Sequence, residues 1–209
     1  MNSQVGWTKE PEGDVSTKSA RAIHVAYIQP ITIMDIMSNY SRLFVKGGTY
    51  FFTLVTHNRQ QFLCEESSIT RLKAAFHYAK NKYPFQIIAL VILPDHLHCV
   101  WKLPENDDNF SIRWSMIKRY FSIGFEASIN YRREKEIWQR RFWEHLVRDD
   151  RDLNRCLDYI HYNPVKHGYV KTPYDWKYST FRHHVSRGYY DSKWGCGEKP
   201  KDMKEWLLE

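Results

Sequence analysis

The chain has 209 residues, of which 43% are hydrophobic and 16% aromatic, which suits one globular domain with a substantial core. The formal net charge of +7 favours a polyanionic partner, most commonly nucleic acid, although a merely basic soluble protein would have the same balance. The four cysteines form no CxxC pair and no apolar run reaches the length of a membrane span, which argues against a thiolate zinc site, a disulfide framework and a membrane protein.

Residues 1–36 differ from the rest of the chain. The first twenty are polar and without periodicity, and the apolar stretch that follows is interrupted by Pro30. We expect an N-terminal extension, either a flexible leader or the product of an upstream start codon. No basic stretch followed by an apolar one is present there, so we expect an untargeted, cytoplasmic protein. The domain is predicted over 37–195, with a charged tail over 196–209.

Strands and helices alternate after residue 37. Residues 85–93 are apolar on both faces, which is typical of a central strand covered on both sides, and Pro94-Asp95 is the expected turn of a hairpin. This order predicts an α+β sandwich with a mainly antiparallel sheet. In chain order we expect a strand over 49–56, a helix over 67–83, strands over 85–93 and 96–103, a helix over 109–129, a short strand within 138–149, a helix that begins near 150 and is stopped by Pro164, and a short helix within 176–188.

The run LPDHLHCVW places two histidines two residues apart. In a strand, His96 and His98 share one face with Val100, and the residues between them pack on the other face. Two imidazoles side by side on a rigid strand could hold a metal ion. They could also be ordinary residues of a polar face, and the pair alone is a weak signal.

The helix predicted near 150–163 carries a second set of polar groups. Tyr159 and Asn163 are four residues apart and project from the same flank of its apolar face, whereas Tyr162 falls on the opposite, solvent side. If that flank meets the histidine face, two imidazoles, an amide oxygen and a phenol come together. A metal held by neutral ligands keeps its full charge, polarises a phosphodiester and favours attack by the phenolate. The simpler alternatives are a half-buried tyrosine and an asparagine that ends a helix before Pro164.

Four blocks of the sequence resemble the REP-associated tyrosine transposases, a branch of the HUH single-strand endonucleases. The resemblance runs from about residue 37 to about residue 194. The blocks are FVKGGTYFFT (44–53), LPDHLHCVWKLP (93–104), IWQRRFWEHLVRDD (137–150) and LDYIHYNPVKHGYV (157–170).

This resemblance implies a fold, a site and a reaction. The fold would be a ferredoxin-like antiparallel sheet sandwiched by helices. His96, His98 and Asn163 would hold Mg²⁺ or Mn²⁺, and Tyr159 would be the nucleophile. The substrate would be single-stranded hairpin DNA of the REP (repetitive extragenic palindromic) type, cut through a 5′-phosphotyrosine intermediate by a monomer or a homodimer.

Basic residues that could contact DNA lie in and around an arginine-rich and aromatic block over 130–151. Guanidinium groups bind phosphates or guanine edges, and aromatic faces stack on unpaired bases. The alternative is a solvated face whose tryptophans and phenylalanine belong to the core. The candidates are Arg140, Arg141 and Arg148 within this block and Lys118, Arg119 and Lys166 outside it.

Three functions are compatible with these observations. The first is the tyrosine nuclease and strand transferase implied by the resemblance. The second is a metal phosphoesterase that uses water, with Tyr159 positioning the DNA. The third is a hairpin-binding regulator without catalysis. A covalent protein–DNA adduct separates the first from the second, and the third predicts tight binding that persists in chelator and no cleavage with any metal.

Overall fold

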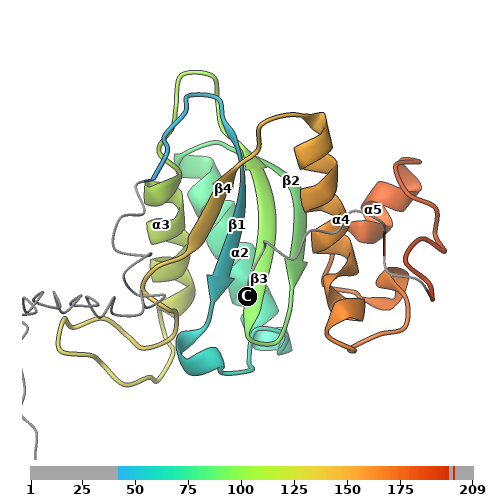
Figure 1. Cartoon of the computed structure of the whole chain (residues 1–209). Helices are drawn as coiled ribbons and strands as arrows, with labels where there is room; N and C mark the ends of the chain where they lie inside the picture. The colour runs from blue at the N-terminus through green and yellow to red at the C-terminus, as the bar shows by residue number, and fades with distance from the viewer. Residues whose placement is uncertain (1–41, 198–199, 201–209) are drawn as a thin grey trace, which may run out of the picture. The chain divides into compact units, whose positions relative to one another are not determined.

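The computed structural model describes residues 42–197 and Pro200. The extension predicted over 1–36 lies outside these residues, as does most of the predicted tail. Figure 1 shows the arrangement. The strands are β1 (Thr49–Val55), β2 (Gln86–Ile92), β3 (His96–Lys102) and β4 (Trp143–Leu146); the helices are α2 (Glu66–Lys82), α3 (Phe110–Ser122), α4 (Asp150–Lys166) and α5 (Phe181–Ser186); and two short 3₁₀ helices are η1 (His57–Arg59) and η2 (Pro173–Asp175).

The four strands form one antiparallel sheet in the order β2-β3-β1-β4. With α2 between β1 and β2, and α3 between β3 and β4, this is the β-α-β-β-α-β arrangement of ferredoxin-like domains. Helices α2 and α3 pack on one face, and α4 packs on the other (Figure 1). The expected α+β fold and the β2–β3 hairpin are confirmed.

Alternation along the strands divides the buried side chains between the two faces. Phe52 and Trp101 pack with Trp114 of α3, and the two tryptophan rings stack with centroids 4.1 Å apart. Phe51 and Val100 belong to the cluster that packs against α4. The sheet thus has an aromatic core on the α2/α3 face and a second, smaller core under α4.

Strand β2 was predicted to be central but is an edge strand. Its outer edge is hydrogen-bonded to a later segment: Ile92 N–H donates to the Tyr178 carbonyl, Thr180 N–H donates to the Leu90 carbonyl, and His184 Nε2 donates to the Ile88 carbonyl. Both faces of β2 are nevertheless covered by helices. A strand that is apolar on both faces indicates that both faces are covered. It does not indicate whether another strand pairs with each of its edges.

The second and third predicted helices end elsewhere than expected. Helix α3 stops at Ser122 because Gly124 adopts a left-handed φ of +80°, which favours glycine and cannot continue a helix. Helix α4 passes through Pro164 and ends at Lys166. The proline lies in the last turn, where only one N–H bond is lost, and His167 N–H still bonds to the Asn163 carbonyl.

Helix α4 has a second buried side, which faces α5. The rings of His161 and His184 have centroids 4.7 Å apart, and both side chains are buried. Tyr162, which was predicted to face solvent, is half-buried with its ring 6.4 Å from that of Trp194. Figure 1 shows α4 between the sheet and α5, so the prediction failed because α4 is covered on two sides.

No helix in the described part of the chain combines the length and apolarity that crossing a bilayer requires.

Candidate active site

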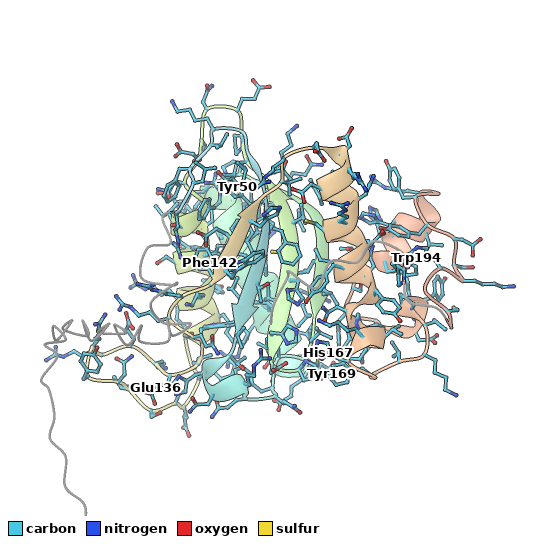
Figure 2. All side chains as sticks on the ribbon, viewed as in Figure 1. Tyr50, Glu136, Phe142, His167, Tyr169 and Trp194 are labelled. Carbon is cyan, nitrogen blue, oxygen red and sulfur yellow. The ribbon has the colours of Figure 1, made fainter. Side chains whose placement is uncertain are left out.

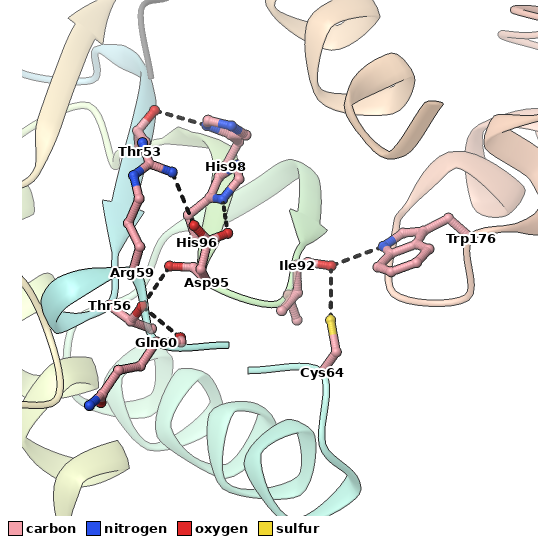
Figure 3. Close-up of polar contacts among 10 residues, drawn as sticks. All are labelled: Thr53, Thr56, Arg59, Gln60, Cys64, Ile92, Asp95, His96, His98 and Trp176. Atoms are coloured by element: carbon pink, nitrogen blue, oxygen red, sulfur yellow. Dashed lines mark hydrogen bonds and ion pairs between the residues drawn. The ribbon is translucent and has the colours of Figure 1, made fainter. Parts of the chain in front are cut away.

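The two histidines lie on β3, on the face that α4 covers. Both side chains are about 1% exposed, and their ring centroids are 4.9 Å apart. The strand register places Thr53 of β1 opposite His98, and Thr53 Oγ1 lies 2.8 Å from His98 Nδ1 (Figure 3). The predicted common face is therefore confirmed, and the neighbouring strand orients one of its rings.

Asp95 orients the other ring. Its Oδ1 accepts a hydrogen bond from His96 Nδ1 at 2.6 Å, and its Oδ2 forms an ion pair with Arg59 at 3.0 Å (Figure 3). Burial raises the pKa of Asp95, but the bonds from His96 and Arg59 outweigh burial and leave that pKa below its ordinary value. An ionised carboxylate only accepts hydrogen bonds, so His96 carries its proton on Nδ1 and directs the Nε2 lone pair away from Asp95.

Tyr159 reaches this face from α4. Its ring lies edge-on to that of His98, with centroids 5.2 Å apart, and also contacts Phe51. Lys166 donates from Nζ to Tyr159 Oη at 3.2 Å and lies 4.9 Å from the ring centroid. A phenol bonded to an ammonium group is placed where negative charge on its oxygen would be stabilised.

Asn163 lies between two contacts that α4 makes with the histidines. His98 faces Tyr159, four residues before Asn163, and His96 faces His167, four residues after it, with ring centroids 5.2 Å apart. Helix periodicity therefore places the buried Asn163 on the side toward both rings. Two imidazoles with Nδ1 engaged and one amide form a neutral donor set that fits a divalent cation.

Thr53, Asp95 and His167 were missed at the level of sequence. Asp95 precedes His96 directly, so a carboxylate partner for the first imidazole could have been proposed from the sequence. Thr53 is 45 residues away from His98, and only the β1–β3 register brings the two together. His167 comes into contact because α4 continues beyond Pro164.

A basic pocket of about 810 Å³ lies between α3 and the segment before β4. Because α3 packs on the opposite face of the sheet, this pocket is separate from the histidine site. One acidic residue, Glu134, also contributes to its wall. The basic residues that line it are Arg42, Lys118, Arg119, Arg133, Lys135 and Arg140.

The six DNA candidates thus fall into three places. Lys118, Arg119 and Arg140 line the basic pocket, Lys166 contacts Tyr159, and Arg141 and Arg148 are exposed outside both. Lys118 is half-buried and donates to the carbonyls of residues 139 and 140. Burial lowers the pKa of Lys118 to about 8, although Glu134 acts in the opposite direction.

A further cluster of metal-ligand types joins β4 to α4. His145 Nε2 lies 2.8 Å from Asp152 Oδ2, and Cys156 is close to both. Burial, followed by the charge of Asp152, raises the pKa of the Cys156 thiol to about 12, so the thiol stays protonated at neutral pH. The His145–Asp152 bond is sufficiently explained as a link between the strand and the helix.

Comparison with known proteins gives consistent matches. Residues 44–163 match the family model described as Transposase IS200 like. A REP-associated tyrosine transposase of Escherichia coli (strain K12) is 46% identical over 158 residues, which cover 76% of this chain and 91% of the relative. A Haemophilus influenzae relative, assigned provisionally to the same group, is 47% identical over 166 residues, covering 76% and 94%. A solved structure described as a REP-associated tyrosine transposase bound to a REP hairpin has a TM-score of 0.69 and 42% identity, covering 83% of this chain and all of that one.

Proposed function

This chain belongs to the IS200-like transposases and, among them, to the REP-associated tyrosine transposases of the HUH class, and from that premise we propose that it cuts and rejoins single-stranded DNA beside REP-type hairpins, with Tyr159 as the nucleophile. The proposal is supported above all by the contact between the rings of Tyr159 and His98, together with the hydrogen bond from Lys166 to the Tyr159 phenol oxygen. The hairpin substrate is taken from the relative whose structure holds one.

The proposed reaction is a transesterification. Tyr159 Oη bonds to the scissile phosphorus as the bond from phosphorus to the 3′ oxygen breaks. The phenol proton is released and the departing 3′ oxygen takes one up, so the products are a 5′-phosphotyrosine and a free 3′-OH. Attack by a 3′-OH on the phosphotyrosine reverses the step and rejoins strands without an external energy source.

The ion in this proposal is Mg²⁺ or Mn²⁺, held by His96, His98 and Asn163. When bound, such an ion polarises the scissile phosphate and stabilises charge that develops in the transition state. Asp95 and Thr53 engage the Nδ1 atoms of the two imidazoles, which leaves the Nε2 atoms as the ones that would hold the ion. Lys166 stabilises negative charge on Tyr159 Oη before attack and again when the tyrosine leaves.

DNA outside the cut site is proposed to bind at the basic pocket. Arg119, Arg140 and their basic neighbours there would neutralise phosphates of the hairpin. Binding through phosphates weakens as salt increases, whereas preference for a hairpin over an unstructured strand should persist at matched salt.

The test is adduct formation with a labelled REP-type hairpin that carries single-stranded flanks, incubated with Mn²⁺ and analysed on denaturing gels. We expect an SDS-resistant protein–DNA adduct that chelator and Tyr159→Phe both abolish. Tyr162→Phe is the matched control, because Tyr162 lies on the same helix but faces Trp194. It should leave the adduct intact.

The other outcomes select the alternatives. Cleavage without an adduct would favour a phosphoesterase that uses water. Tight hairpin binding that persists in chelator, without cleavage in any divalent metal, would favour a regulator. An adduct that survives Tyr159→Phe and disappears in Tyr162→Phe would assign the nucleophile to Tyr162 instead.

A further inference from the structure

Three aromatic side chains continue outward from the histidine site; we refer to His167, Tyr169 and Trp176 as the aromatic row. The ring of His167 lies 5.2 Å from that of His96. Tyr169 stacks on His167 with centroids 5.9 Å apart, and Trp176 stacks on Tyr169 at 5.4 Å, both with an interplanar angle of 28°. Figure 2 shows His167 and Tyr169 together at the end of α4.

Local backbone structure fixes the row. Gly168 follows α4 with a left-handed φ of +73°, and this turn places His167 and Tyr169 on the same side. The N–H groups of residues 167, 168 and 169 all bond back to carbonyls of the last turn of α4. Trp176 is held from the other side, because its Nε1 donates to the Ile92 carbonyl at 2.9 Å (Figure 3). The row is therefore tied to both the helix and the sheet.

The row has the properties of a surface that binds an unpaired base. Its rings stack at interplanar angles of 28°, and Tyr169, in the middle of the row, is 39% exposed. Single-strand binding proteins combine aromatic rings of this kind with nearby cations that hold the backbone. Lys177, the exposed residue directly after Trp176, is such a cation, whereas Lys166 is bonded to Tyr159.

We propose that the aromatic row is a stacking subsite for an unpaired base next to the phosphodiester bond that Tyr159 attacks. The proposal rests on the function proposed above and adds to it the position of a flanking nucleotide. The row is continuous with His96, so a strand whose phosphate lies at the histidines would pass directly over it. A base inside a duplex is already stacked on both sides, so the subsite favours single-stranded flanks.

The subsite can be tested apart from cleavage in a Tyr159→Phe background, which removes the proposed nucleophile. Hairpin DNAs carry 2-aminopurine at one flanking position at a time, because stacking quenches its fluorescence. We expect quenching on binding at one flanking position. Tyr169→Ala and Tyr169→Leu should remove the quenching and weaken binding of flanked hairpins about ten-fold, whereas Tyr169→Phe should retain both. A hairpin without flanks should bind all variants equally.

The matched control is Tyr174→Ala, since Tyr174 has a similar exposure of 40% but lies outside the row. The subsite would be overturned if the Tyr169 variants left the quenching unchanged at every flanking position, or if Tyr174→Ala had an equal effect. A failure of the DNAs to bind would overturn it as well. Because no covalent step is involved, Tyr169-dependent quenching in a protein that forms no adduct would uphold the subsite while the proposed chemistry failed.

Discussion

On the face of the sheet toward α2 and α3, β3 presents Leu97, Cys99 and Trp101 to a closely packed aromatic core. On the face toward α4, the same strand presents His96 and His98. Both sets are buried to the same extent: Trp101 is 0% exposed and each histidine 1%. Burial therefore does not distinguish the core face from the site face.

The two faces differ in how their side chains are held. On the core face, Trp101 and Trp114 are oriented by the stacking of their rings. On the site face, hydrogen bonds with Thr53 and Asp95 orient the imidazoles, and burying such polar groups is unfavourable without those partners. Substitutions on the core face should thus act mainly on stability and those on the site face mainly on chemistry.

Trp114→Ala is expected to have the largest effect and to act on stability. The ring contacts Trp101 and Phe52, and its removal leaves a cavity, so the free energy of unfolding should fall by about 3–5 kcal/mol. Chemical denaturation measures this loss. The rate of adduct formation per folded molecule should change little, and a loss of that rate at full stability would contradict the division between faces.

His98→Gln should have the opposite profile. An amide can still bond to Thr53, so stability should change little, but Mn²⁺ affinity and adduct formation should fall, the latter roughly 10²–10³-fold. Electron paramagnetic resonance of Mn²⁺ and gel assays measure the two. Cys99→Ala is the control, because the neighbouring Cys99 faces the core; similar loss of Mn²⁺ binding in both variants would refute the assignment.

Lys166→Met should slow adduct formation about ten-fold, equivalent to roughly 1.4 kcal/mol of activation free energy. Methionine keeps the apolar stem but removes the charge on Tyr159 Oη. Lys166→Arg should restore part of the rate, which a purely structural role would not require. Hairpin affinity, measured by fluorescence anisotropy, should be nearly unchanged; a parallel loss of affinity would point to a role in DNA binding.

The smallest expected effect lies away from both faces, at the contact of α4 with α5. Burial lowers the pKa of His184, the bond to the Ile88 carbonyl opposes it, and His183 and Arg187 lower it further. A base with a depressed folded-state pKa takes up its proton more readily when unfolded, so stability should fall as pH drops through about 6.5. His184→Gln should flatten this slope between pH 7.5 and 5.5, as measured by thermal denaturation. The neighbouring His161, whose pKa burial lowers to about 3, leaves a residual slope. An unchanged slope would exclude His184 as a contributor.

Local periodicity was sufficient to predict much of this arrangement. The two-residue period of β3 placed His96 and His98 on one face, and the helical period of α4 placed Tyr159 and Asn163 together. Each pattern lies within one strand or one helix, so it can be recognised without knowing what that element packs against.

Features that depend on a distant partner were not predictable in the same way. Thr53 acquires its role only through the β1–β3 register. The burial of His161 and Tyr162 depends on α5 and Trp194, whose segment has too little periodicity to indicate where it packs. The edge position of β2 likewise depends on strand order, which side-chain patterning does not encode.

The bonds between β2 and residues 178–184 also restrict how this chain can assemble. Outward backbone groups of Ile88, Leu90 and Ile92 are already engaged by the chain itself, so a foreign strand could extend the sheet there only by displacing that segment. Strand addition by a second copy of the chain at this edge would therefore have to break these bonds first.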